Sequence, residues 1–370
     1  MILKNAEVFA YGKDFITTDI TIENGKIVSL EKTDAPGEDF SGKKILPGFI
    51  DIHIHGCGGA DACDAEAESL EKMSEYLASK GVTSFCPATM TLPKEELKKV
   101  FAAIGNEMGK EKGAYIHGIN MEGPFISKEK AGAQAKEHII PPDIALFKEL
   151  NAICPVKLVD IAPETDGALE FIEEAKNISV VSAAHTAATC EEIAEAEKRG
   201  LSHATHLFNA MTQFLSREPG TVGAVFASDK ITAEMICDGI HISPTALKAA
   251  FKTLGEDRTV IISDAMMAAG LEDGEYTLGG QRVIKKGDAR LADGTLAGSV
   301  TNLFDEFKNV ISFGIPIKQA VKSVTINPAK VIGADSFTGS IEPGKNADLT
   351  VLDEGFESIL AVYVKGVKVK

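Results

Sequence analysis

The repeated alternation of strand-like and helix-like segments is the feature that most limits how this chain can fold. Eight short apolar segments are typical of buried strands, and amphipathic segments typical of helices separate several of them. The eight segments are residues 48–55, 83–89, 115–122, 157–163, 178–185, 202–208, 232–238 and 259–265. Such a series favours a (β/α)8 TIM-type barrel over an open doubly wound sheet. The absence of G-x-G-x-x-G after the first strand also argues against a dinucleotide-binding fold. We therefore predict an α/β protein in which residues 46–337 form the barrel.

Both ends of the chain show a different pattern, with short alternating strands and tight turns. Asn24-Gly25 separates ITIE from KIVSL, which is a two-residue hairpin signal, and Lys365-Gly366 divides a similar pair near the C-terminus. Chain termini often lie close together in folded proteins. We therefore expect residues 1–45 and 338–370 to form one small β-sandwich domain, with the barrel inserted between them.

Charge and cysteine usage limit the class of partner and the compartment. The formal net charge of the 370 residues is -16, and no basic cluster stands out, which argues against nucleic acid or an anionic membrane as a partner. Six cysteines are scattered without a C-x-x-C pair, as expected for reduced thiols. No signal-peptide pattern or bilayer-length apolar run is present. The sequence predicts a cytoplasmic protein.

The segment ILPGFIDIHIHGCGG, residues 45–59, carries the first chemical signal. His53 and His55 stand at positions i and i+2 at the end of an apolar strand pattern, so both imidazoles lie on the same face. Such a pair is able to hold one metal ion. Taken alone it is weak evidence, because two polar rings also occur at strand ends without any metal.

Further metal-binding side chains close four other predicted strands. Glu122 ends the third strand, His185 the fifth, His206 the sixth and Asp264 the eighth. Each of these residues has an ordinary alternative, such as a helix cap or a surface acid. In a barrel, however, the carboxyl ends of the strands meet at the same face, where active sites lie. Convergence of these groups with the histidine pair favours a metal centre.

Several longer motifs extend this interpretation to a family. They are PGFIDIHIHG, MEGPF, AHT, THLFNAM, REPG, DGIH, SDAM and LAGS. The chain resembles the amidohydrolase superfamily and, more narrowly, the N-acetylglucosamine-6-phosphate deacetylase family, over nearly its whole length. MEGPF and THLFNAM are far more specific than His-x-His. The resemblance implies metal-dependent hydrolysis of the N-acetyl amide of N-acetylglucosamine 6-phosphate, which yields glucosamine 6-phosphate and acetate.

The resemblance also implies the roles of the metal-binding residues. The principal divalent metal would be bound by Glu122, His185 and His206. A second metal, bridged by Glu122, would be bound by His53 and His55. Asp264 would face the metals as general base and acid, taking a proton from metal-bound water and passing it to the sugar nitrogen. Histidine and carboxylate ligands accept zinc, iron, manganese or cobalt, so we expect one or two such ions per subunit.

Substrate contacts are implied at five further positions. Arg217 in SREPG, together with Asn209 and Ala210, would contact the sugar phosphate, for which a guanidinium fork is well suited. His241 in DGIH would bind the sugar by a hydrogen bond. Gln134 stands where some relatives carry a histidine that polarises the substrate carbonyl. Because an amide cannot titrate, we expect Gln134 to be a binding contact only.

Other functions are alternatives to this predicted deacetylase activity. The closest are deacetylation of N-acetylgalactosamine 6-phosphate and hydrolysis of a different amide by another type of amidohydrolase. Cyclic-amide enzymes often carry a lysine at the end of strand four, and KLVDIAPET has none there. A catalytically silent assembly protein would have lost Asp264 or His185, and both are present. The resemblance further implies a homodimer in which the partner chain reaches the phosphate.

Overall fold

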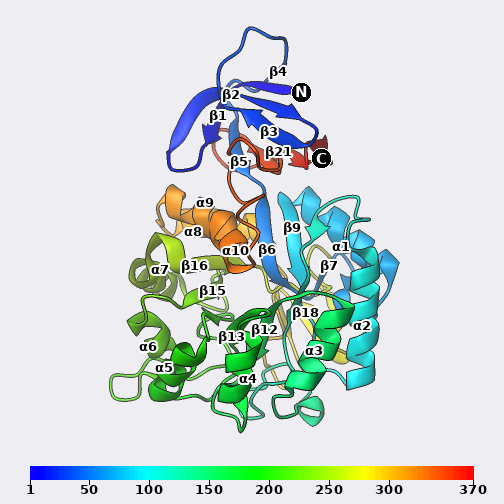
Figure 1. The fold of residues 1–370 in the computed structure, drawn as a ribbon, viewed down its shortest axis with the longest axis vertical. Helices are drawn as coiled ribbons and strands as arrows, with labels where there is room; N and C mark the ends of the chain where they lie inside the picture. The colour runs from blue at the N-terminus through cyan, green and yellow to red at the C-terminus, as the bar shows by residue number, and fades with distance from the viewer.

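The chain forms a large region of parallel strands and helices and a smaller sheet-rich region that contains both termini. The computed structural model describes residues 1–370. The two ends of the chain lie side by side in the smaller region, above the larger one in Figure 1. The mixed α/β class predicted from the sequence is confirmed.

The parallel strands form two sheets. One has the order β10-β9-β6 and the other the order β11-β12-β13-β14-β15-β16. An isolated parallel bridge between Ala88 and Asn120 links the two sheets, and the Asp264 amide donates to the His53 carbonyl over 3.0 Å. The strands are β6 (Phe49–Ile54), β9 (Val82–Pro87), β10 (Tyr115–Ile116), β11 (Ile119–Met121), β12 (Val156–Ile161), β13 (Val180–Ala183), β14 (His203–Ala204), β15 (Thr232–Ile236) and β16 (Thr259–Ile262).

Each predicted strand segment overlaps one of these strands, although the third segment is split. The interruption falls at His117 and Gly118, between β10 and β11. Gly118 has a φ of +139°, and a Cβ atom there would lie 2.5 Å from the Pro155 carbonyl oxygen. Only glycine fits this close approach, so the strand changes direction at this point.

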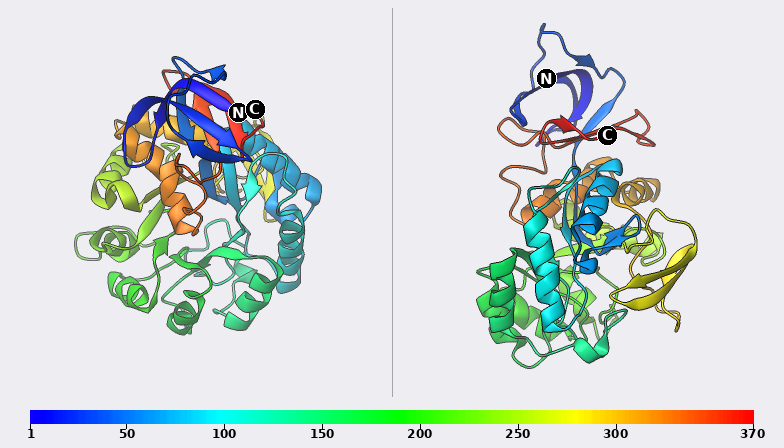
Figure 2. Two further views of the ribbon diagram at one scale, coloured as in Figure 1. Left: turned by 45° about the horizontal axis from the view of Figure 1, so that its top comes forward. Right: turned by 90° about the vertical axis from the view of Figure 1, so that its right-hand side faces the viewer.

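Helices follow most of the parallel strands and surround them, as the turned view in Figure 2 shows. Except for the last helix, their apolar faces join a single cluster of 65 buried hydrophobic residues, which forms the main core. The helices are α1 (Ala67–Ser79), α2 (Lys94–Glu107), α3 (Ile144–Ile153), α4 (Ala168–Ala175), α5 (Cys190–Arg199), α6 (Gly220–Ala227), α7 (Pro244–Arg258), α8 (Leu303–Ser312), α9 (Ile317–Val324) and α10 (Ile326–Val331). None of them combines the length and apolar character needed to cross a lipid bilayer.

The terminal strands are connected in one sheet built from both ends of the chain, and their packing as a sandwich stays a prediction. Its order is β22-β21-β20-β5-β1-β2-β3, and β4 also pairs with β1. Because β1 bonds to strands on both of its edges, the strands remain in one continuous sheet. They are β1 (Ile2–Phe9), β2 (Phe15–Glu23), β3 (Lys26–Ser29), β4 (Glu38–Asp39), β5 (Lys44–Pro47), β20 (Leu349–Leu352), β21 (Ile359–Val364) and β22 (Val367–Lys368).

The two predicted hairpin turns are confirmed in this sheet. Glu23 pairs with Lys26 around Asn24-Gly25, and Val364 pairs with Val367 around Lys365-Gly366. In both turns the two central residues have positive φ, as a two-residue hairpin of this kind requires.

A second small sheet lies between β16 and α8 and was not predicted from the sequence. It is antiparallel and consists of β17 (Gly274–Leu278), β18 (Gln281–Lys286) and β19 (Asp288–Arg290). We call these three strands the flap. In the right-hand view of Figure 2 the flap, in yellow, projects from the side of the larger region. A shorter pair, β7 (Gly56–Cys57) and β8 (Ala60–Asp61), follows β6.

Candidate metal centre

The structure brings the six predicted ligand side chains together at the carboxyl ends of the parallel strands. His53 lies in β6 and His55 just after it, Glu122 follows β11, and the other three each lie two residues beyond a strand end. These three have positive φ values, +43° at His185, +31° at His206 and +46° at Asp264. Such values cost non-glycine residues about 1–3 kcal/mol each. The strain is concentrated where the side chains converge.

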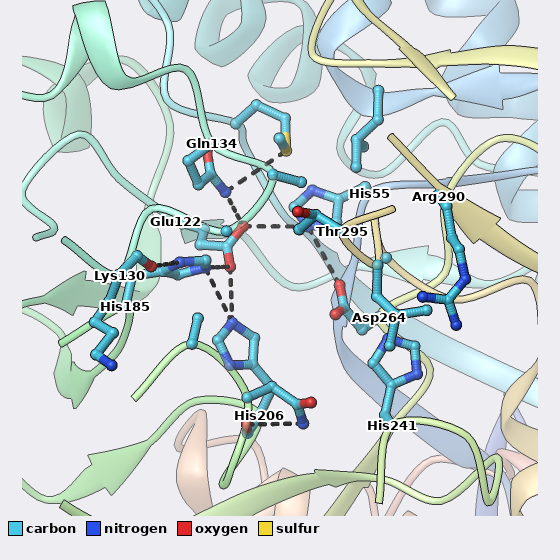
Figure 3. Close-up of a pocket in the computed structure, with 18 of the residues that line it drawn as sticks. His55, Glu122, Lys130, Gln134, His185, His206, His241, Asp264, Arg290 and Thr295 are labelled. Carbon is cyan, nitrogen blue, oxygen red and sulfur yellow. Dashed lines mark hydrogen bonds and ion pairs between the residues drawn. The ribbon is translucent and has the colours of Figure 1, made fainter. Parts of the chain in front are cut away.

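The six side chains form two groups of possible ligands. The groups are His53, His55 and Asp264, and Glu122, His185 and His206. Within each group the ligand atoms lie within 4.8 Å of one another. Glu122 contacts both groups, because its Oε1 lies 3.0 Å from His185 Nε2 and its Oε2 lies 3.2 Å from His55 Nε2. Figure 3 shows the Glu122 carboxylate between the imidazole rings.

The ring nitrogens indicate that this cluster suits a metal ion. His185 Nε2 and His206 Nε2 lie 3.2 Å apart. On the other side of its ring, His185 donates its Nδ1 proton to the Lys130 carbonyl over 2.8 Å. A neutral His185 ring therefore directs an unprotonated nitrogen at the cluster. His53 Nε2 is fully buried and has no hydrogen-bond partner. Histidine nitrogens and carboxylate oxygens in this arrangement fit a divalent metal.

The pKa values of the buried histidines also indicate a site that suits a cation. Burial would lower the pKa of His55, but Asp264 and Glu122 outweigh it and raise that pKa to about 10. Burial would also lower the pKa of His53, but the Glu234, Glu122 and Asp264 carboxylates outweigh it. They hold that pKa well above its ordinary value. The buried carboxylates thus favour positive charge at this point, and a divalent cation supplies it.

A cavity of about 490 Å³ opens onto the cluster. Five of the six possible ligands line it, and His53 lies behind them. Four of the predicted substrate contacts also line this cavity, namely Gln134, Asn209, Ala210 and His241. From the flap side, Leu278 and Arg290 contribute to the wall. The cavity therefore joins the metal-binding groups to polar side chains able to hold a small substrate.

Comparison with known proteins identifies the family. The model of the amidohydrolase family matches residues 45–369 of this chain. The chain belongs to the amidohydrolase family. Fold comparison agrees, with TM-scores of 0.93 to two solved structures that are 34% and 30% identical to it. The first is N-acetylglucosamine-6-phosphate deacetylase from Thermotoga maritima, covering 100% of this chain and 99% of that one. The second is a mutant N-acetyl-D-glucosamine-6-phosphate deacetylase from Mycobacterium smegmatis in complex with N-acetyl-D-glucosamine-6-phosphate, with the same coverage.

Two curated amidohydrolase relatives are similar over most of their length. N-acetylglucosamine-6-phosphate deacetylase from Bacillus subtilis (strain 168) is 39% identical over 93% of this chain and 90% of the relative. N-acetylgalactosamine-6-phosphate deacetylase from Escherichia coli O157:H7 is 32% identical over 94% of this chain and 93% of the relative.

Gln134 contacts protein groups through both ends of its amide. Its Nε2 donates to Glu122 Oε2 over 2.6 Å, and its Oε1 accepts from the Thr91 amide over 2.7 Å. Although Gln134 lines the cavity, these bonds orient Glu122. In this amidohydrolase the residue therefore supports a carboxylate that is a possible metal ligand, a contact that the sequence did not predict.

Arg217 and His241 differ in their relation to the cavity. Arg217 is exposed on the loop after β14 and does not line the cavity of its own chain. Its predicted phosphate contact stays a prediction. His241 lines the cavity, and its Nδ1 lies 2.7 Å from Asp238 Oδ2, which fixes the ring.

Some residues at the site were missed by sequence reasoning. Lys130 and Arg290 line the cavity. Lys130 lies four residues before Gln134 in the sequence, so the same stretch held a signal for it. Arg290 belongs to the flap, and nothing in the strand pattern placed it near the cluster. Glu234 is buried beside His53 from the interior of β15, where a carboxylate gives no strand-end signal.

Proposed function

We propose that this amidohydrolase hydrolyses the N-acetyl amide of N-acetylglucosamine 6-phosphate and releases glucosamine 6-phosphate and acetate. The observation that carries the proposal is the pair of ligand groups joined by Glu122 at the floor of a cavity lined by predicted sugar-phosphate contacts. The relatives named for this activity, similar over nearly the whole chain, support it.

The metal-binding part of the proposal assigns each group a role. Glu122, His185 and His206 would hold the principal divalent metal, and His53, His55 and Asp264 would face a second. Zinc, iron, manganese and cobalt all suit these ligands. When bound, such an ion lowers the pKa of water and polarises the carbonyl group that is attacked.

Asp264 is the proposed proton carrier. Burial would raise its pKa, but His55, His53 and His206 hold it below the ordinary value, so the carboxylate is ionised and able to accept a proton. It takes one proton from the attacking water as the oxygen bonds to the acetyl carbon. It then delivers that proton to the nitrogen as the carbon–nitrogen bond breaks. Acetate and the free amine are the products.

Residues around the cavity are proposed to bind the rest of the sugar phosphate. Asn209 and Ala210 are placed to contact the phosphate, and His241 to contact a sugar hydroxyl. Arg217 would have to reach a phosphate from a neighbouring copy, because it lies outside the cavity of its own chain. A homodimer that presents Arg217 in this way, in the cytoplasm, completes the proposal.

The proposal extends to the architecture. The bridge between Ala88 and Asn120 and the bond from the Asp264 amide to the His53 carbonyl link both pairs of facing sheet edges. We infer that β6, β9, β10 with β11, and β12 to β16 make one closed (β/α)8 barrel. Residues 46–337 would form this barrel domain, and residues 1–45 with 338–370 a terminal β domain.

A galacto-configured substrate is the second candidate. It is favoured by the similarity to N-acetylgalactosamine-6-phosphate deacetylase, which covers 94% of this chain. The two sugars differ only in the orientation of one hydroxyl group, so the same catalytic groups would serve both.

Acetate release tests the proposal. Purified protein would be loaded with zinc, iron, manganese or cobalt and given N-acetylglucosamine 6-phosphate, its galacto epimer or unphosphorylated N-acetylglucosamine. We expect fast release from the first substrate that requires both the metal and the phosphate, and chelator-treated protein is the control. Faster release from the galacto epimer would favour the second candidate. No release from any of the three sugars by metal-loaded protein would overturn the substrate assignment.

A further inference from the structure

Glu234 contacts both groups of possible metal ligands from beneath. It lies in β15 and is completely buried. Its Oε2 lies 3.0 Å from His53 Nδ1, in the first ligand group. The same oxygen accepts from the backbone amide of His206, in the second group, over 3.3 Å. Glu234 does not line the cavity, so it cannot contact substrate directly.

The position of Glu234 determines which nitrogen His53 offers to a metal. Glu234 Oε2 accepts the His206 backbone amide and lies within hydrogen-bond distance of His53 Nδ1, so this carboxylate oxygen faces two nitrogen donors. A carboxylate only accepts hydrogen bonds, so His53 must keep its proton on Nδ1. Nε2 is then the nitrogen that His53 directs at the other ligands, 3.7 Å from Glu122 Oε1 and 3.6 Å from Asp264 Oδ1.

His203 lies beside the other oxygen of this carboxylate without forming a hydrogen bond to it. Its Nε2 lies 3.2 Å from Glu234 Oε1, and its Nδ1 lies 2.6 Å from Thr232 Oγ1. Both His203 and Glu234 are fully buried. Because Oε2 is held between His53 Nδ1 and the His206 amide inside this packed interior, the carboxylate has little freedom to rotate and fixes the plane of the His53 ring.

We propose that Glu234 is the positioning residue that prepares His53 for a second metal ion. The inference rests on the metal-binding part of the proposed function. Residues in the second layer around a metal typically change its affinity by about 10- to 100-fold when they are replaced. Loss of Glu234 should therefore release the ion at His53, His55 and Asp264 before the ion at Glu122, His185 and His206.

Metal binding in the substitution Glu234→Gln tests this proposal without any substrate. Glutamine keeps the size but replaces one acceptor oxygen by a donor, so His53 loses its fixed protonation. We expect zinc-loaded wild-type protein to hold two ions, and the variant to retain one while binding the other at least about tenfold more weakly. Elemental analysis and competition with a chelator measure the stoichiometry and the affinity.

Glu306→Gln is the matched control. Glu306 is also a fully buried glutamate, and its Oε2 accepts from the Cys237 amide over 2.7 Å. Burial raises its pKa well above the ordinary value, so an amide resembles its protonated form. It contacts no member of either ligand group, and the control should keep both zinc ions.

A second measurement covers the case in which Glu234→Gln does not fold. Nitrogen-15 NMR of metal-free wild-type protein labelled at histidine reports the protonation of each ring nitrogen directly. We expect one buried histidine, assigned as His53 by its loss in His53→Asn, to be protonated on Nδ1 and to shift at Nε2 as zinc is added.

Four results would overturn the inference. They are two ions bound by Glu234→Gln with wild-type affinity, equal loss of both ions, a single wild-type ion that the substitution leaves unaffected, and a His53 ring whose Nε2 does not respond to zinc. Because none of these readouts involves acetate release, failure of the substrate assignment would leave the positioning role intact.

Discussion

At the scale of single residues, Asp264 carries the sharpest prediction about the chemistry. It is the one carboxylate in the group with His53 and His55, and its Oδ1 lies 3.3 Å from His55 Nε2. Asp264→Asn keeps the shape of the side chain but removes its ability to take a proton. We expect kcat for acetate release to fall by about 10²- to 10⁴-fold. Metal content at Glu122, His185 and His206 should be retained, which elemental analysis checks. More than a tenth of the wild-type kcat would rule out the proton-carrying role.

Lys130 offers a second prediction at this scale. Its carbonyl accepts from His185 Nδ1, and Lys130 is one of the two strongly basic residues that line the cavity. Arg290, the other strongly basic cavity residue, is already bonded to Asp288 over 2.6 Å. Lys130→Met should therefore raise KM for the phosphorylated sugar by about tenfold, because a charge-assisted contact is lost. KM for the unphosphorylated sugar should change little.

The exposed Lys128, two residues away and outside the cavity, provides the control for this measurement. Lys128→Met should leave both KM values unchanged. Equal effects of Lys130→Met on both sugars would contradict a contact with the phosphate.

At the scale of elements, the flap connects packing to substrate binding. Leu278 in β17 is buried in a small cluster with Met90, Met266 and Val283, and it also lines the cavity. The flap is further tied to the rest of the chain by Lys285, which donates to the Ala268 carbonyl over 3.2 Å. The flap therefore forms one wall of the cavity, and its position depends on a few buried contacts.

Leu278→Ala tests this dependence. Removing the side chain leaves a void in the cluster, which costs about 2–5 kcal/mol where the surroundings cannot collapse. We expect KM to rise several-fold while the metal content stays at the wild-type level. The control is Ile284→Ala in β18, because Ile284 is 42% exposed and contributes little to packing. Loss of metal from Leu278→Ala would show that the flap supports the ligands as well.

At the scale of the whole molecule, Asp348 ties the terminal sheet to the parallel strands. It precedes β20, and its Oδ2 accepts from the Tyr115 hydroxyl of β10 over 2.9 Å. The same oxygen accepts from Thr338 Oγ1, and Oδ1 accepts from the Lys365 amide. Only 4% of Asp348 is exposed, so breaking this network leaves buried donors without partners.

Asp348→Asn should therefore destabilise the protein by about 1–3 kcal/mol, with a defined pH dependence. Burial raises the pKa of Asp348 above its ordinary value of 3.8, despite three hydrogen bonds that lower it. A carboxyl group whose pKa is higher in the folded state than in the unfolded state stabilises the folded protein fully at pH values below the unfolded pKa. This stabilisation is lost as the pH rises through the folded pKa. The stability gap between wild type and variant should thus shrink from pH 4 to pH 7.

Urea unfolding at several pH values measures this gap. The exposed Asp14→Asn provides the control and should show no such trend. A gap that stays constant, or that widens as pH rises, would contradict the raised pKa of Asp348.

The sequence by itself located the side chains that converge at the cluster, together with the parallel strands and the terminal hairpins. Its success has a physical reason: strand patterns and tight turns are local, and the carboxyl ends of parallel strands meet at the same face. A histidine or carboxylate that ends such a strand, as His206 and Asp264 do, is therefore placed without knowledge of its neighbours.

The tertiary structure decided what depends on contacts between distant parts of the chain. Glu234 meets His53 across 181 positions, and no local pattern encodes that pairing. The flap strands are short and half-exposed, so the periodicity of their sequence is weak. The order of the strands in the terminal sheet follows from the pairing of β1 on both of its edges. The Gln134 side chain points toward Glu122, and Arg217 lies outside the cavity of its own chain. The fold of the surrounding loops sets both positions.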